Sequence, residues 1–81
     1  MPRLRRVSPT SPGWTRRPHG SGFRYLDDSG TSLSADQVAR IKALVIPPAW
    51  RDVWICPVPN GHLQATGVDA AGRRQYLYHP H

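Results

Sequence analysis

Five residues near the C-terminal end of the chain have side chains suited to contacting a nucleic acid. They supply two cations, one amide and two phenols, and they are Arg73, Arg74, Gln75, Tyr76 and Tyr78. Guanidinium and phenol groups can bind phosphates, and an amide can make paired hydrogen bonds to a base edge in the major groove. The segment therefore has the chemistry of a surface that binds duplex DNA.

Strand geometry limits how these side chains can act together. Neighbouring residues of a flat strand point to opposite faces, so Gln75 and Tyr76 are separated while Tyr76 and Tyr78 share a face. Gln75 and Tyr76 both reach DNA only if a bulge follows Gly72 or if the strand approaches the groove edge-on. The alternative is that the two tyrosines pack in the core.

The element that carries these residues is predicted to be a β-hairpin. Two strand-like runs, residues 63–68 and 73–78, flank Asp69-Ala-Ala-Gly. An aspartate can bond to its own backbone, and a glycine can take the positive φ that closes a short loop. The hairpin therefore presents its second strand next to a tight turn.

Other short runs predict the rest of a sheet. Residues 23–27 and 31–33 are expected to form a first hairpin around a turn, and residues 53–56 a further strand. Residues 48–51 are expected to be a turn or one short helical turn. We therefore expect a small α+β fold, with a mainly antiparallel sheet of four or five strands, one main helix and room for a second short helix.

The main helix is predicted to begin after Ser34. Ser34 and Gln37 fit a capping box, and Pro47 disfavours helical geometry at the preceding residue, so the helix should end near Val45. An apolar stripe at helical spacing is formed by Val38, Ile41, Leu44 and Val45. Arg40 and Lys42 fall off this stripe, on a face open to solvent or to phosphates.

The first 22 residues are expected to be a disordered basic arm that precedes a folded domain at residues 23–81. The six basic residues up to residue 24 are all arginines with no acid among them, whereas five basic residues and five aspartates balance each other afterwards. Four prolines and three glycines accompany few large apolar residues, so this arm cannot offset the entropy of ordering. It is either a solubilising tail or a source of non-specific phosphate contacts through Arg3, Arg5, Arg6, Arg16 and Arg17.

No metal, cofactor or catalytic site is expected in this chain. The four histidines fit no zinc pattern, and Cys56 has no second cysteine for a disulfide, so it is predicted to be a small buried hydrophobe. No serine or cysteine lies in a nucleophile motif. No apolar run approaches the ~18 residues of a membrane span, and no signal peptide follows Met1. We expect a soluble monomer without a membrane partner, located in the cytoplasm with the nucleoid.

Four segments carry a resemblance to a known family. They are Ile46-Pro-Pro-Ala-Trp, Asp52-Val-Trp-Ile, Pro59-Asn-Gly-His-Leu-Gln-Ala-Thr-Gly and Asp69-Ala-Ala-Gly-Arg-Arg-Gln-Tyr-Leu-Tyr-His-Pro. Together they resemble the N-terminal domain of bacterial and poxvirus-like type IB DNA topoisomerases, in order and over residues 23–80. This ordered match is more specific than any single motif.

The resemblance implies a mechanism for the parent protein. Type IB topoisomerases nick one DNA strand with a tyrosine, hold a 3′-phosphotyrosyl link, let the helix rotate, and reseal without metal or ATP. Because that machinery belongs to a separate C-terminal domain, we expect neither Tyr76 nor Tyr78 to be the nucleophile. This chain by itself is expected to have no catalytic activity, and its implied partners are duplex DNA and the catalytic domain of the same protein.

The resemblance also implies roles for individual residues. In the family, the N-terminal domain forms half of a clamp and places part of its sheet in the major groove. Matched by motif, Gln75, Tyr76 and Tyr78 resemble groove-contacting residues, with Arg73 as the cation beside them. Ala71 stands where the poxvirus pattern has a lysine, so the strict sequence preference of the viral enzymes is not implied here.

Two other functions also fit the sequence. A freestanding nucleic-acid binder would depend on the arm and show little preference for a duplex. A protein-interaction or assembly module would pair its tyrosine strand with a partner. In that module, DNA binding would disappear when residues 1–22 are removed.

Overall fold

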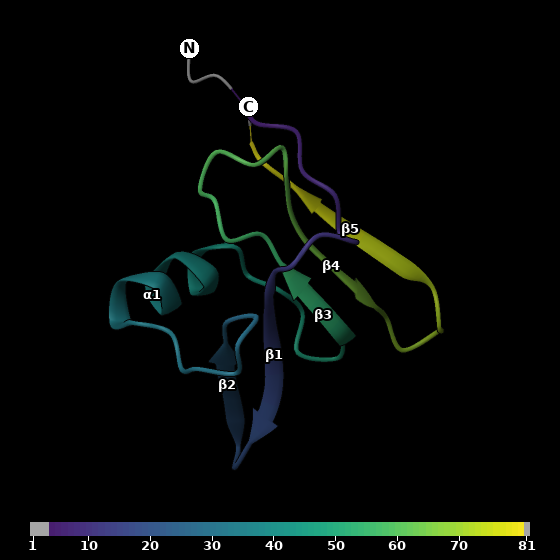
Figure 1. The fold of residues 1–81 in the computed structure, drawn as a ribbon. Helices are drawn as coiled ribbons and strands as arrows, with labels where there is room; N and C mark the ends of the chain where they lie inside the picture. The colour runs from purple at the N-terminus through teal and green to yellow at the C-terminus, as the bar shows by residue number, and fades with distance from the viewer. Residues whose placement is uncertain (1–3, 81) are drawn as a thin grey trace.

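The structure, a computed structural model, describes residues 4–80 of the chain. These residues contain one sheet of five antiparallel strands and a single helix (Figure 1). In chain order the elements are β1 (Trp14–His19), β2 (Gly22–Leu26), α1 (Ala35–Ala43), β3 (Arg51–Ile55), β4 (Leu63–Val68) and β5 (Arg74–Tyr78). The strand order is β2-β1-β3-β4-β5, so β2 and β5 form the two edges. The expected α+β class, with an antiparallel sheet and one main helix, is confirmed.

The first strand lies in the segment that was expected to be disordered. The assignment of all of residues 1–22 to a disordered arm is wrong, because β1 pairs with β2 on one side and with β3 on the other. Trp14 of β1 is 7% exposed and belongs to the core. The sequence of β1 shows no apolar alternation, since this one tryptophan provides its buried surface.

The segment before β1 also contacts the folded domain. The Arg5 N–H donates to the Asn60 carbonyl at 2.8 Å, and the His62 N–H donates to the Arg5 carbonyl at 2.9 Å. The Val7 N–H donates to Nδ1 of His62 at 3.1 Å. Residues 5–7 therefore run beside the loop that precedes β4, and the fold begins well before residue 23.

The partner of β2 differs from the expected one. β1 pairs with β2 over its length, whereas residues 31–33 form no strand. They make one isolated bridge between Leu26 and Ser32 and a hydrogen bond from the Leu33 N–H to the Tyr25 carbonyl at 3.2 Å. The helix cap at Ser34 follows at once, so too few residues remain for a strand.

Helix α1 begins as the sequence predicts and ends earlier. The capping box of Ser34 and Gln37 is present, with the Gln37 N–H donating to Ser34 Oγ at 3.2 Å and the Ser34 N–H to Gln37 Oε1 at 2.8 Å. The last helical residue is Ala43. Val45 has a φ of 55° and is 79% exposed, so it is not part of the predicted buried stripe.

The core lies between α1 and one face of the sheet. Ile41 of α1 packs with four buried residues of three strands, which are Trp14, Val53, Ile55 and Ala65. The connector between α1 and β3 contains a turn, closed by the Trp50 N–H and the Pro47 carbonyl at 3.1 Å, and no second helix. Cys56 is fully buried, as expected.

The Trp50 ring lies directly over a glycine of β4, and this contact gives a first testable prediction. A Cβ built on Gly67 would lie 2.7 Å from Cε3 of Trp50, so Gly67→Ala requires the ring to move. We expect this variant to lower the free energy of unfolding by about 1–3 kcal/mol, the usual cost of overpacking, in urea denaturation followed by circular dichroism.

Gly22→Ala is the matched control for that measurement. A Cβ on Gly22 would meet nothing nearer than the His19 carbonyl at 4.0 Å. Gly22→Ala should therefore change the free energy of unfolding by less than about 0.5 kcal/mol. Equal stability of the two variants would contradict the packing of Trp50 on β4.

Candidate nucleic-acid interface

The hairpin predicted to carry the site is formed by β4 and β5. Its register pairs Ala65 with Leu77, Thr66 with Tyr76 and Gly67 with Gln75. A bulge in β4 lies between Leu63 and Ala65. The predicted strand bounds, 63–68 and 73–78, differ from the observed ones only at residue 73. β5 is an edge strand, so its second side lies open (Figure 1).

The two tyrosines of β5 lie outside the core. Tyr76 is 46% exposed and Tyr78 is 63% exposed, and their rings stack with centroids 6.3 Å apart. The alternative that they pack in the core is therefore wrong. Aromatic rings usually bury most of their surface, so an exposed stacked pair presents two flat apolar faces to a ligand.

Gln75 lies on the opposite face of β5 from the tyrosines. It is half-buried, and Gly67, its partner across the hairpin, is covered by the Trp50 ring. Because β5 is at the sheet edge, side chains on its two faces flank one open edge. The bulge in the hairpin lies in β4 and not after Gly72, so Gln75 and Tyr76 would both reach DNA only through the edge-on approach.

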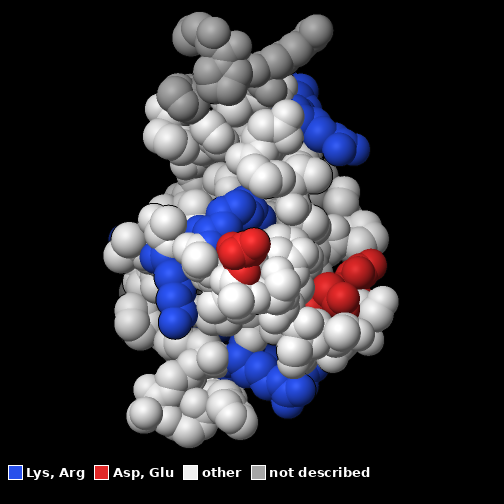
Figure 2. Space-filling model, turned by 90° about the vertical axis from the view of Figure 1, so that its left-hand side faces the viewer, with Lys and Arg blue, Asp and Glu red and all other residues white. Residues whose placement is uncertain are grey.

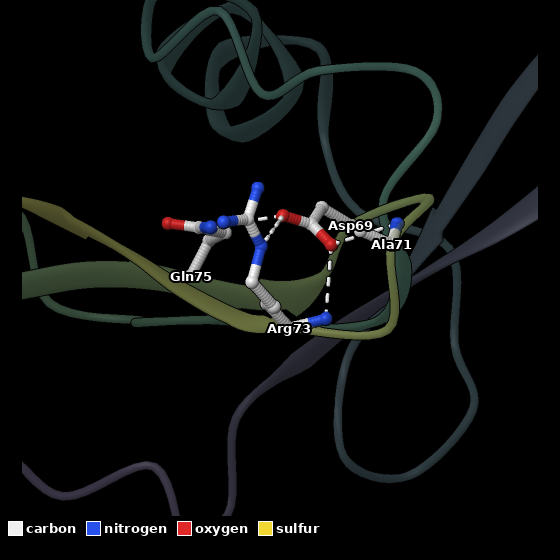
Figure 3. Close-up of polar contacts among 4 residues, drawn as sticks. All are labelled: Asp69, Ala71, Arg73 and Gln75. Atoms are coloured by element: carbon white, nitrogen blue, oxygen red, sulfur yellow. Dashed lines mark hydrogen bonds and ion pairs between the residues drawn. The ribbon is translucent and has the colours of Figure 1, made fainter.

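The turn between β4 and β5 is closed by the carboxylate of Asp69 (Figure 3). Oδ1 accepts the N–H groups of Ala71 and Arg73 at 3.0 and 2.9 Å, and Oδ2 accepts Nε2 of Gln75 at 2.9 Å. The Nε of Arg73 lies 3.4 Å from Oδ2. The backbone N–H of Arg73 and the amide of Gln75 lower the pKa of Asp69 below its ordinary value.

The predicted site residues of the hairpin are brought together by this turn and strand. Arg73 is 75% exposed beside Asp69, and Arg74 is exposed on the face of the tyrosines. All five residues, Arg73, Arg74, Gln75, Tyr76 and Tyr78, therefore surround the open edge of β5.

Arg16, predicted to contact phosphates, has a structural role in the described residues. Its guanidinium donates to the carbonyls of Ile46, Pro47 and Trp50 at 3.3, 2.9 and 2.9 Å, and it lies 4.1 Å from the centre of the Phe23 ring. Desolvation by burial lowers its pKa. We correct the prediction, because these contacts tie β1 to the connector before β3.

Arg40 has a similar structural role and is not simply on a solvent-facing surface. It donates to Oε1 of Gln64 at 2.7 Å and to the Cys56 carbonyl, and its guanidinium lies 5.0 Å from the centre of the Trp14 ring. It therefore joins α1 to the sheet.

The other arginines predicted to contact phosphates keep exposed side chains. Arg5, Arg6 and Arg17 are exposed, whereas Arg3 lies outside the described residues. Their contact with phosphates stays a prediction.

Comparison with known proteins decides the family. Residues 22–69 match the family model described as the N-terminal domain of bacterial DNA topoisomerase IB. The chain belongs to this family. It is also 43% identical over 54 residues to the DNA topoisomerase 1B of Acanthamoeba polyphaga mimivirus. That alignment covers 67% of this chain and 16% of the viral protein.

Two strands of this topoisomerase IB N-terminal domain lie outside residues 22–69, the range that the family model matches. β1 precedes residue 22, and β5 follows residue 69. The family resemblance is confirmed, while the roles of the β5 side chains rest on the geometry described above.

One cation near the tyrosine face, Arg51, was missed by sequence reasoning. Arg51 pairs with Val68, which pairs with Arg74, so Arg51 lies in a row on the face that carries Tyr76. Arg51 and Arg17 both line a cleft of about 680 Å³ between β1 and the start of β3. The irregular register of β3, with Asp52 at a φ of 50°, determines this placement, and no local sequence signal predicts it.

The side of the domain that carries α1 has mixed charge. Figure 2 shows that Lys and Arg atoms there form separate groups with aspartates between them. That side therefore presents no continuous basic patch among the described residues, and the candidate interface is the tyrosine strand.

Residues 4–80 contain neither a cluster of metal-binding side chains nor a membrane-spanning helix. No three His, Cys, Asp or Glu side chains in this range come together around a potential metal position. No helix in the same range has the length and hydrophobicity to cross a lipid bilayer.

Proposed function

We propose that this domain binds duplex DNA and inserts β5 into the major groove. The observation that carries the proposal is the stacked, exposed pair Tyr76 and Tyr78 on an edge strand. An edge strand can enter a groove about 12 Å wide, and tyrosine can contact a thymine methyl or a phosphate there. Arg73 and Arg74 add charge at the point where the strand begins.

We further propose that the domain acts as the N-terminal half of a clamp in a type IB topoisomerase. Its family membership and its likeness to a viral DNA topoisomerase 1B support this role. The parent protein would relax supercoils with a catalytic domain that is distinct from this one. Tyr76 and Tyr78 would then bind DNA and perform no strand cleavage.

A titration of the ¹⁵N-labelled chain with a random-sequence duplex tests the proposed function. We expect amide shifts centred on residues 73–78 and a Kd on the order of 10⁻⁴ to 10⁻⁶ M at physiological salt, typical of non-specific contacts. The double variant Tyr76→Ala, Tyr78→Ala should weaken binding about tenfold, because it removes both exposed rings.

Val45→Ala is the control for loss of exposed apolar surface. Val45 is 79% exposed on the loop after α1, so its truncation should leave the Kd within about twofold. Shifts confined to residues 4–13 would contradict the proposal.

One specific observation favours a second function. The open edge of β5 can also pair with a strand of another protein, as the assembly-module interpretation requires. In that case the double tyrosine variant would leave the affinity for DNA unchanged.

A further inference from the structure

The turn before β5 controls the direction of the Gln75 side chain, which lies on the strand that the proposed function inserts into the major groove. Asp69 has two oxygens with separate partners, since Oδ1 accepts backbone N–H groups of the turn and Oδ2 accepts Nε2 of Gln75. The Asp69 side chain is only 18% exposed, and its position is fixed by these backbone bonds (Figure 3). The Gln75 amide is therefore attached to a rigid turn.

A carboxylate allows only one orientation of that amide. An ionised carboxylate accepts hydrogen bonds and cannot donate them, so the nitrogen of Gln75 must face Asp69 and the carbonyl must face away. Figure 3 shows Oε1 of Gln75 on the side away from Asp69. The amide then offers one acceptor and one remaining N–H to a ligand.

We propose that Asp69 is a positioning residue that makes Gln75 select adenine, an inference that rests on the proposed function. Adenine presents a donor at N6 and an acceptor at N7 in the major groove, which matches the free acceptor and the free N–H of Gln75. Guanine presents two acceptors at O6 and N7, and Gln75 has only one N–H left for them. Asp69 thus removes the donor that a second contact to guanine would need.

The neighbouring groups are consistent with this role. Arg73 lies 3.4 Å from Oδ2 and offsets the charge of the carboxylate near the DNA phosphates. On the core side, Gly67 opposite Gln75 is covered by Trp50. Gln75 is therefore half-buried, and its amide nitrogen is held at the turn by Asp69.

Asp69→Asn is the variant that isolates the orientation. An asparagine oxygen can still accept the backbone N–H groups of the turn, so the hairpin should fold. Its amide N–H would face Gln75 and would favour the flipped orientation, with the carbonyl of Gln75 toward residue 69. An unchanged backbone amide spectrum outside residues 69–75 would show that the fold is kept.

The first experiment measures binding of the 81-residue chain by fluorescence anisotropy to two duplexes. One is an alternating A·T duplex about 16 base pairs long, roughly one and a half turns, and the other replaces each A·T pair by inosine·5-methylcytosine. The replacement exchanges the N6 donor of adenine for the O6 acceptor that guanine has, while the N7 acceptor, the C5 methyl group and the minor-groove edge stay the same. We expect the chain to bind the A·T duplex about tenfold more tightly, and Asp69→Asn to reduce this ratio below about twofold.

The outcomes separate this inference from the proposed function. A ratio that stays near tenfold in Asp69→Asn, or a ratio near one in the unaltered chain, would overturn only the selection of adenine by Asp69 and Gln75. Absence of binding to both duplexes would overturn the proposed function as well.

The second experiment needs no DNA. In the free chain, the side-chain NH₂ signals of Gln75 should move as Asp69 is protonated, with a midpoint below 3.8, the ordinary value for this carboxyl, because the contacts in the turn lower the pKa of Asp69. The contact is therefore complete above that pH and is lost as the pH falls further. Gln37, in the capping box of α1, is the internal control. A Gln75 signal that does not follow the titration of Asp69 would overturn the positioning role.

Discussion

Removal of residues 1–22 is expected to unfold this domain. The deletion takes away β1, which lies between β2 and β3, and with it Trp14 in the core. Truncating a buried tryptophan costs about 3–5 kcal/mol, which is as much as a domain of this size usually has in total. Both the deletion and Trp14→Ala should therefore lose the cooperative unfolding transition in urea, measured by circular dichroism.

The control keeps the strand and removes charge from the segment before it. Arg5→Gln, Arg6→Gln alters two exposed side chains, while the backbone bonds of Arg5 to residues 60 and 62 remain. The free energy of unfolding of this variant should lie within about 0.5 kcal/mol of that of the unaltered chain. A cooperative transition of normal midpoint in the deletion variant would show that β1 is dispensable.

This expectation changes how the contribution of the N-terminal arginines to DNA binding must be tested. Loss of binding after deletion would report unfolding and not loss of phosphate contacts. The Arg5→Gln, Arg6→Gln variant measures those contacts in a folded domain. It should reduce the slope of log Kd against log salt concentration by up to about 2, the loss of two phosphate contacts.

Arg16→Ala is expected to lower the free energy of unfolding by about 3 kcal/mol. Its guanidinium holds three carbonyls of the connector and covers the Phe23 ring, and a hydrogen bond to a charged group contributes about 1.5–3 kcal/mol. The expected loss corresponds to one or two such bonds, because the site is only half-buried. Urea denaturation of the purified variant measures the change.

The neighbouring residue provides the matched control for Arg16. Arg17 is exposed on the other face of β1, opposite Arg24, so Arg17→Ala should change stability by less than about 0.5 kcal/mol. If Arg17 contacts phosphates, its variant should weaken DNA binding, while Arg16→Ala should leave binding unchanged below its unfolding temperature. The reverse pattern would contradict the structural role of Arg16.

Local features of the fold were predictable because the residues that cause them are close in sequence. The capping box of Ser34 and Gln37 spans one helical turn, and Asp69 and Gly72 close a loop of a few residues. Such interactions depend on neighbouring dihedral angles and not on the rest of the fold. The hairpin at residues 63–78 and the resemblance carried by its residues could be recognised for the same reason.

Long-range features could only be learned from the tertiary structure. β1 forms because its backbone pairs with β2 and with β3, far along the chain, and its composition alone predicts an arm. Arg16 and Arg40 look like phosphate-binding or solvated cations until the carbonyls they contact are brought beside them.

Residue patterns along the chain were enough to predict the family, the helix start, the hairpin and the set of side chains on β5. Three features required the folded structure: the place of β5 at the sheet edge, the opposite faces of Tyr76 and Gln75, and the contact of Asp69 with the amide of Gln75. Strand order and exposure depend on the pairing of segments distant in sequence, whereas side-chain chemistry is present in the chain before it folds.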